Sequence, residues 1–236
     1  MQSFLLLAER LRLFTRAALD VLAPRTCGAC GRGGAAGALC AECLEQASRP
    51  VFVPPPNAVG SLPVRAFGWF SPPLSLAIKQ FKYSGRTDLA LPLAELWWQR
   101  CAPAVVAGSP VVLVPVPLHA RRLVERGYNQ SALLATRLAR LARAQVWHDG
   151  LERTHYTEQQ ALLGAHDRAK NLHSAFKPGR RPRALGEARI VLVDDVVTTG
   201  ATLRACEAAF RSSNLAVSEV WALAQTPRPE TTQPDG

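Results

Sequence analysis

The stretch Ile190-Val-Leu-Val-Asp-Asp-Val-Val-Thr-Thr-Gly-Ala-Thr202 joins an apolar run, two adjacent carboxylates and a threonine-rich turn. Its first four residues are aliphatic, which predicts a strand buried on both faces of a sheet. The turn then leads into a helix that we expect from Thr202 to about Ser212. A buried strand followed directly by a helix is the repeating unit of α/β proteins with a parallel sheet.

The rest of the chain repeats this alternation of strands and helices. β-Branched and aromatic residues mark the strands, and helical spacing of leucines marks the helices. The expected strands are 64–70, 111–116 and 217–224, and the expected helices are 75–82, 88–100 and one opened by Gly127 that runs to about Ala144. The predicted fold class is therefore α/β, with a parallel sheet covered by helices on both faces.

The end of the 190–193 strand combines groups that suit a sugar phosphate. Ligands of open parallel sheets bind at the carboxyl ends of the strands. There the first turn of the next helix offers free N–H groups to a phosphate, and Gly200 lets the backbone approach it closely. Asp194 and Asp195 suit hydroxyl groups one ribose length away. The alternative is a solvated Asp pair at the end of a strand, followed by an ordinary threonine helix cap.

Four cysteines near the N-terminus form two CxxC pairs, Cys27-Gly-Ala-Cys30 and Cys40-Ala-Glu-Cys43. Two such turns can aim four thiolates at one point, as structural Zn²⁺ sites require. Two disulfides or a redox CxxC are the alternatives. A cytosolic chain disfavours disulfides, and a redox motif would not come in duplicate. We therefore predict a structural zinc ion that folds a module too small to bury a core alone.

Composition shifts divide the chain into four segments. No stretch reaches the roughly 20 apolar residues that cross a bilayer, so we expect a cytoplasmic protein. The first segment has helical spacing of apolar residues with arginines between them, which predicts an amphipathic helix docked on the surface or, alternatively, weakly associated with a membrane. The segments are 1–24 (amphipathic helix), 25–58 (four-Cys zinc module and Pro-rich linker), 59–225 (α/β domain) and 226–236 (disordered tail).

The chain is strongly basic, and its basic residues are unevenly distributed along the sequence. Its 28 Lys and Arg exceed 18 Asp and Glu, which gives a formal net charge of +10. Residues 100–143 and residues 168–189 each hold seven basic residues against a single glutamate. An anionic partner is expected, and charge alone does not distinguish a small phosphate from a polymer.

Val191-Leu-Val-Asp-Asp-Val-Val-Thr-Thr-Gly-Ala-Thr202 resembles the 5-phosphoribosyl 1-diphosphate (PRPP) binding motif of type I phosphoribosyltransferases. The chain as a whole is similar to the ComF family of competence-associated proteins, which includes GntX-like members. That resemblance rests on the order of several short motifs. They are the four-cysteine module, Phe81-Lys-Tyr-Ser-Gly-Arg86, Val114-Pro-Val-Pro-Leu118, Arg126-Gly-Tyr-Asn-Gln130, the stretch 159–176 and the 190–202 segment.

The resemblance implies a type I phosphoribosyltransferase-like core, spanning residues 59–225, behind a small zinc module. In such a core Asp194 and Asp195 would hold the ribose hydroxyls, Mg²⁺ would accompany PRPP, and residues 159–176 would form a mobile flap. Basic side chains would stabilise the departing diphosphate, with Lys82 and Arg122 closest to the chemistry. The remaining phosphate contacts would come from Val196, Val197, Thr198, Thr199, Gly200, Ala201, Thr202, Lys79, Arg121, Arg126 and Arg168.

Two functions fit these expectations. The first is a Mg²⁺- and PRPP-dependent phosphoribosyltransferase with an unknown acceptor, linked to DNA uptake. The second is a non-catalytic PRPP-fold protein that binds single-stranded DNA and a ComFA-like helicase during transformation or DNA repair. For the second, the outward arginines Arg137, Arg140 and Arg143 are the expected DNA surface.

Overall fold

The computed structural model describes residues 26–35, 37–49, 57–102, 110–154, 175–180, 186 and 188–227. The expected N-terminal helix, the proline-rich linker, Arg168 and all but two residues of the expected flap lie outside these ranges, as does most of the expected tail.

A six-stranded sheet forms the centre of the molecule, in the order β1-β2-β8-β7-β3-β4. All neighbouring strands are parallel except β1, which pairs with β2 in antiparallel fashion at one edge. The predicted α/β class with a parallel sheet is confirmed. The strands are β1 (Asn57–Val59), β2 (Leu62–Trp69), β3 (Val111–Pro115), β4 (Gln145–Val146), β7 (Arg189–Val197) and β8 (Val217–Gln225).

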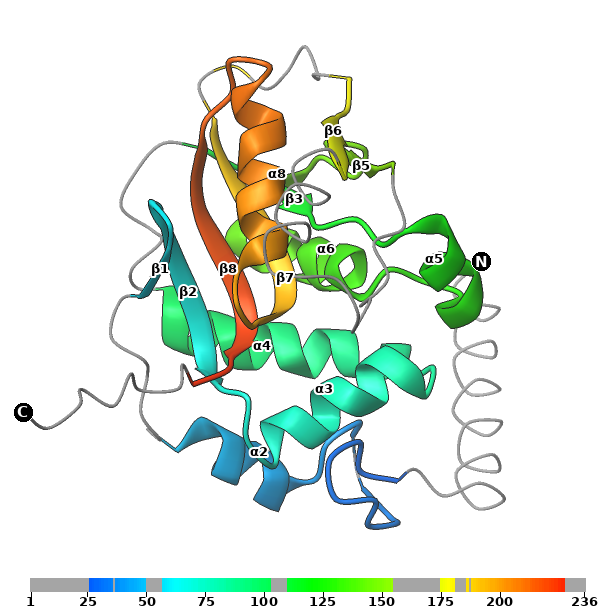
Figure 1. The fold of residues 1–236 in the computed structure, drawn as a ribbon. Coiled ribbons are helices and arrows are strands. Elements are labelled where there is room, and N and C mark those ends of the chain that lie inside the picture. The colour runs from blue at the N-terminus through cyan, green and yellow to red at the C-terminus, as the bar shows by residue number, and fades with distance from the viewer. Residues whose placement is uncertain are drawn as a thin grey trace, which may run out of the picture.

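Helices cover both faces of this sheet, as Figure 1 shows. Alternate residues of β7 divide between two hydrophobic clusters, because successive side chains of a strand point to opposite faces. Val191 and Val193 pack in the cluster that contains α3 (Leu74–Tyr83), α4 (Ala90–Cys101) and α6 (Gln130–Ala142). Ile190 and Leu192 pack in the cluster that contains α8 (Ala201–Arg211). A 3-10 turn, η1 (Thr87–Leu89), joins α3 to α4.

Helix α6 begins three residues later than its sequence pattern suggested. A short helix, α5 (Ala120–Arg126), precedes it and ends at Gly127, which is left-handed with a φ of 77°. Asn129 caps α6, because its side chain accepts hydrogen bonds from the N–H groups of Ser131 and Ala132. The expectation that Gly127 opens a helix was therefore wrong. Gly127 ends one helix, as glycine commonly does, and Asn129 starts the next.

Two small elements lie outside the main sheet. Strands β5 (Leu151–Arg153) and β6 (Phe176–Pro178) form a separate antiparallel pair, and Phe176 packs in the α8-side cluster. Helix α2 (Ala41–Ser48) follows the second cysteine turn. Figure 1 shows α2 and the cysteine-bearing loops, in blue, lying against α3 and α4. The four-cysteine segment is thus packed on the α/β core.

Candidate functional site

The carboxyl end of β7 carries Asp195, a carboxylate that is only 3% exposed. Its Oδ1 atom forms an ion pair with Lys82 Nζ at 2.8 Å. Its Oδ2 atom is buried and has no hydrogen-bond partner among the described residues. Buried polar atoms are nearly always hydrogen-bonded, so an unpaired carboxylate oxygen at this position marks a place where a ligand could donate a hydrogen bond.

Asp194, the other carboxylate, is partly buried beside Asp195. Its Oδ1 atom accepts hydrogen bonds from Ser131 Oγ at 3.1 Å and from the backbone N–H of Asp195 at 2.9 Å. Burial, and next the negative charge of Asp195, raise the pKa of Asp194 to about 7, although Lys82 acts in the opposite direction. Raised carboxyl pKa values gather at functional sites, because such sites confine like charges away from water.

The turn after β7 is shaped by Gly200, which caps α8 in the left-handed region with a φ of 73°. A Cβ atom on Gly200 would lie 2.3 Å from Val59 Cγ1, so the turn is pressed against strand β1. Thr198 and Thr199 are exposed, and Arg204 Nη1 donates to the carbonyl of Thr199 at 3.0 Å. The turn therefore presents hydroxyl groups and a nearby guanidinium at the start of a helix, a suitable arrangement for an anion.

The residues expected to surround the phosphate differ in how far their side chains are exposed to solvent. Val197 is still in β7 and is 1% exposed, so its side chain belongs to the core. Val196 is also part of β7 and is partly exposed, as are Ala201 and Thr202 in the first turn of α8. The turn, with its exposed Thr198 and Thr199, is therefore the part of this segment most open to a ligand.

Lys82 reaches Asp195 from the last turn of α3, and two contacts hold this end of the helix. The Tyr128 hydroxyl donates a hydrogen bond to the carbonyl of Phe81. The guanidinium of Arg126 lies 4.8 Å from the centre of the Tyr83 ring, in a cation–π arrangement. The motifs around Lys82 and Arg126, distant in the sequence, are thus joined beside the carboxylate pair.

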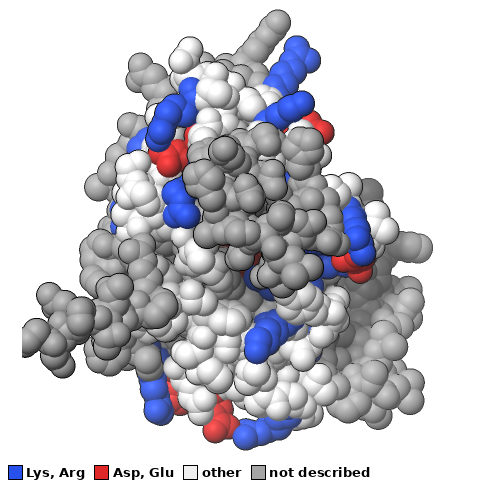
Figure 2. Space-filling model, in the orientation of Figure 1, with Lys and Arg blue, Asp and Glu red and all other residues white. Residues whose placement is uncertain are grey.

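The other basic residues proposed for phosphate are less closely gathered. Arg121 is ion-paired with Glu125 at 3.1 Å, and both side chains are more than half exposed. Arg122 is partly buried on α5, and Lys79 is exposed on α3. On the face shown in Figure 2, blue Lys and Arg side chains are spread over several regions and do not form one patch. Helix α5 nevertheless follows the carboxyl end of β3, the strand next to β7, so it begins at the same end of the sheet as Asp194 and Asp195.

Two site residues were missed by reading the sequence. Ser131 binds Asp194, and Arg204 binds the Thr199 carbonyl. The Asn129-Gln-Ser131 string is a helix start, and recognising Asn129 as its cap would have placed Ser131 in the first turn. Arg204 lies one turn into α8, where nothing in its sequence context separates it from a solvated arginine.

The four cysteines of the N-terminal segment converge on one point. Their sulfur atoms all lie within 4.8 Å of one another. Burial alone would raise the pKa of Cys27, but backbone N–H groups of Cys30, Cys40 and Ala29 lower it to about 6. A cluster of four converging thiols fits a tetrahedral structural Zn²⁺, whose ligands bind as thiolates.

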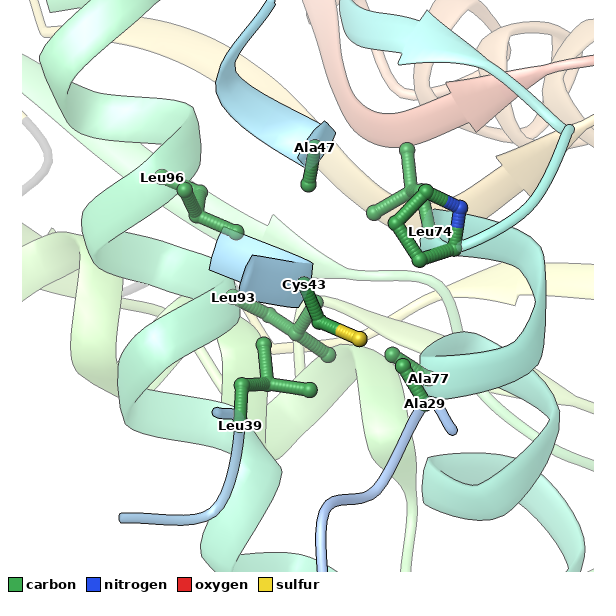
Figure 3. A pocket seen from close by; sticks show the side chains of 9 residues that line it. Ala29, Leu39, Cys43, Ala47, Leu74, Ala77, Leu93 and Leu96 are labelled. Carbon is green, nitrogen blue, oxygen red and sulfur yellow. The ribbon is translucent and has the colours of Figure 1, made fainter. Parts of the chain in front are cut away.

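This cysteine cluster is connected to the core by apolar contacts. Figure 3 shows Leu39 and Cys43 facing Ala77 of α3 and Leu93 of α4 across a small apolar pocket. The pocket leaves no room for a water molecule. Gly28 allows the same close packing, because a Cβ atom there would lie 2.7 Å from a methyl group of Leu89. The four-cysteine segment therefore packs against the helix that carries Lys82.

The chain is similar to known proteins that are named for competence or DNA utilization. No protein-family model matches the chain. It is 33% identical over 161 residues to Competence protein F of Haemophilus influenzae. The aligned residues cover 67% of this chain and 70% of that protein. It is 36% identical over 160 residues to DNA utilization protein YhgH of Escherichia coli O157:H7, covering 66% and 69%. The same protein of Salmonella typhi is 36% identical with the same coverage. Across the described ranges, no helix combines the length and apolar character needed to span a membrane.

Proposed function

Because this chain belongs to the ComF-like family of competence and DNA-utilization proteins, we propose that it binds PRPP with Mg²⁺ and acts in the uptake or handling of DNA. The role in DNA uptake is carried over from the names of the relatives. The single observation that supports binding of PRPP is the arrangement of groups at the end of β7. There a buried carboxylate with one unpaired oxygen lies directly before a hydroxyl-rich turn at the start of a helix.

Each part of PRPP has a suitable neighbour in this arrangement. The ribose hydroxyls would donate to the carboxylates of Asp194 and Asp195. The 5′-phosphate would accept hydrogen bonds from the Thr198–Thr202 turn, where Arg204 adds positive charge. The diphosphate would lie toward α5, whose arginines follow the adjacent strand β3.

The chain's own residues also suit transfer of the phosphoribosyl group. Loss of diphosphate leaves positive charge on the ribose and adds negative charge to the leaving group. Arg122 and Arg126 would stabilise the leaving group, and Lys82 would hold the carboxylate of Asp195 in place next to the ribose through their ion pair. Mg²⁺, when bound, would neutralise charge on the diphosphate oxygens. We therefore propose a phosphoribosyltransferase activity with an acceptor still to be identified.

Calorimetry tests the binding part of this proposal. Zinc-loaded protein titrated with PRPP in the presence of Mg²⁺ should give a saturable heat, and Asp195→Asn should weaken affinity by about tenfold or more, equal to about 1.4 kcal/mol. Asp149→Asn removes an exposed carboxylate of the same kind and should leave affinity unchanged. An absence of PRPP binding by the wild-type protein would contradict the proposal. Release of diphosphate with added nucleobases or nucleotides would then separate turnover from binding.

A second function, direct binding of single-stranded DNA, is favoured by the arginines of α6 and its C-cap. Arg140 and Arg143 are exposed, Arg137 is partly exposed, and none has an acidic partner among the described residues. The triple substitution Arg137/Arg140/Arg143→Ala should lower DNA affinity and reduce its dependence on salt. Unchanged affinity and salt dependence in the triple variant would exclude this surface.

A further inference from the structure

The ion pair between Lys82 and Asp195 places a fixed positive charge inside the carboxylate site. The side chains are 18% and 4% exposed, so water and salt screen the pair only weakly. Tyr128 and Arg126 hold the end of α3 by their contacts with Phe81 and Tyr83. Lys82 is therefore positioned to remain on Asp195.

We propose that Lys82 is a built-in counter-ion that makes the Asp194–Asp195 pair a receptor for hydroxyl groups and prevents it from binding a divalent cation directly. The proposal concerns selectivity within the proposed site. Its hydroxyl ligand rests on the proposed function, whereas its exclusion of metal ions does not.

The exclusion of a cation follows from the position of Nζ. The buried acceptor without a partner, Asp195 Oδ2, belongs to the same carboxylate that Lys82 contacts at 2.8 Å. A Mg²⁺ ion bound to Oδ2 at about 2.1 Å would share this one carboxylate with the ammonium group. Two cations would then compete for one buried carboxylate, and their repulsion is strong where water is excluded.

A hydroxyl group avoids this repulsion. It donates a hydrogen bond to the unpaired Oδ2 and brings no net charge into the site. Asp194 already shows the same kind of interaction, because its Oδ1 accepts from the neutral Ser131 hydroxyl and from a backbone N–H. The pair thus has neutral donors on one carboxylate and a place for another neutral donor on the second.

Binding of Mn²⁺ alone, followed by electron paramagnetic resonance on the zinc-loaded full chain, tests the exclusion. Lys82→Gln keeps a hydrogen-bond donor but removes the charge, and it should create a Mn²⁺ site about tenfold or more tighter than any in the wild type. The added site should disappear in Lys82→Gln/Asp195→Asn. Lys82→Arg keeps the charge, so it should create no added Mn²⁺ site. Lys177→Met removes an exposed lysine elsewhere, so it should leave the Mn²⁺ affinity of the wild type unchanged.

Two results would overturn the proposal. One is a folded Lys82→Gln protein, verified by tryptophan fluorescence, whose Mn²⁺ affinity equals that of the wild type. The other needs no lysine variant: a wild-type Mn²⁺ site that is lost in Asp195→Asn would mean that the carboxylate binds metal despite Lys82.

Ribose 5-phosphate without any metal is the probe for the hydroxyl ligand. The wild-type protein should bind it, and Lys82→Gln should weaken its binding about fivefold or more, because the carboxylate of Asp195 would lose the ion pair that holds it in place. Lys82→Gln affinity equal to the wild type would contradict a positioning role for Lys82. A wild-type protein that binds neither ribose 5-phosphate nor PRPP would count against the proposed function, while the Mn²⁺ measurement would still decide the exclusion of metal.

Discussion

Replacing Asp194 with asparagine should stabilise the folded protein, and by an amount that grows with pH. The asparagine Oδ1 can still accept the hydrogen bonds from Ser131 Oγ and the Asp195 N–H. What the substitution removes is a negative charge that burial and Asp195 oppose. It should therefore remove the electrostatic destabilisation that arises in the wild-type protein because two carboxylates lie close together.

The magnitude follows from the pKa of Asp194, which rises from 3.8 to about 7 on folding. Because the folded pKa is raised, the folded state binds more protons between these values, and this contribution to stability is lost as pH rises through 7. The whole shift corresponds to about 4 kcal/mol, and the part lost between about pH 5.5 and about pH 8 is about 2 kcal/mol. Asp194→Asn has no carboxyl group at this position, so its stability does not decrease with pH for this reason.

Urea unfolding followed by tryptophan fluorescence at these two pH values measures the effect. The stability of Asp194→Asn minus that of the wild type should increase by about 2 kcal/mol from the lower to the higher pH. Asp149→Asn, on an exposed residue, provides the comparison for loss of one surface charge. A difference that stays constant or shrinks as pH rises would refute the assignment of a raised pKa to Asp194.

Three other substitutions test the remaining structure. Gly200→Ala should destabilise the fold by about 2–4 kcal/mol in urea unfolding, because it adds a clash with Val59 to left-handed strain, whereas Gly34→Ala, with a φ of 72° and open space, should show only about 1 kcal/mol. Equal effects would contradict the close contact. Cys43→Ser should lower the zinc content measured by atomic emission, whereas replacing Cys101, outside the cluster, should not; full zinc in Cys43→Ser would refute the site. Glu219→Gln should destabilise by about 2–4 kcal/mol, because Glu219 is buried and pairs with Arg65; an unchanged unfolding midpoint would show that the pair contributes little.

Local sequence was sufficient for the elements that carry their own signals. The aliphatic run before Asp194 predicted β7, and the CxxC spacing predicted the converging thiols, because both depend on neighbours in the chain. Both predictions are confirmed by the structure. Helix α5 was not predicted, since its seven residues include no buried side chain and so carry no apolar periodicity.

Contacts between distant segments could not be predicted in the same way. Nothing in the sequence around Lys82 names Asp195 as its partner, because the pairing depends on where α3 ends relative to β7. Gly200 was expected only to admit an anion, yet its lack of a side chain is also required by Val59 on strand β1. The fold class followed from patterns along the chain, whereas the electrostatics of the site follow from the tertiary packing.

A crystal structure of the zinc-loaded protein soaked with PRPP and Mg²⁺ tests the central claim most directly. We expect the ribose hydroxyls within hydrogen-bond distance of Asp194 and Asp195, with Oδ2 of Asp195 no longer unpaired. The 5′-phosphate should lie on the Thr198–Thr202 turn. PRPP bound elsewhere on the molecule, or a fully soaked crystal with no ligand at the end of β7, would contradict the account.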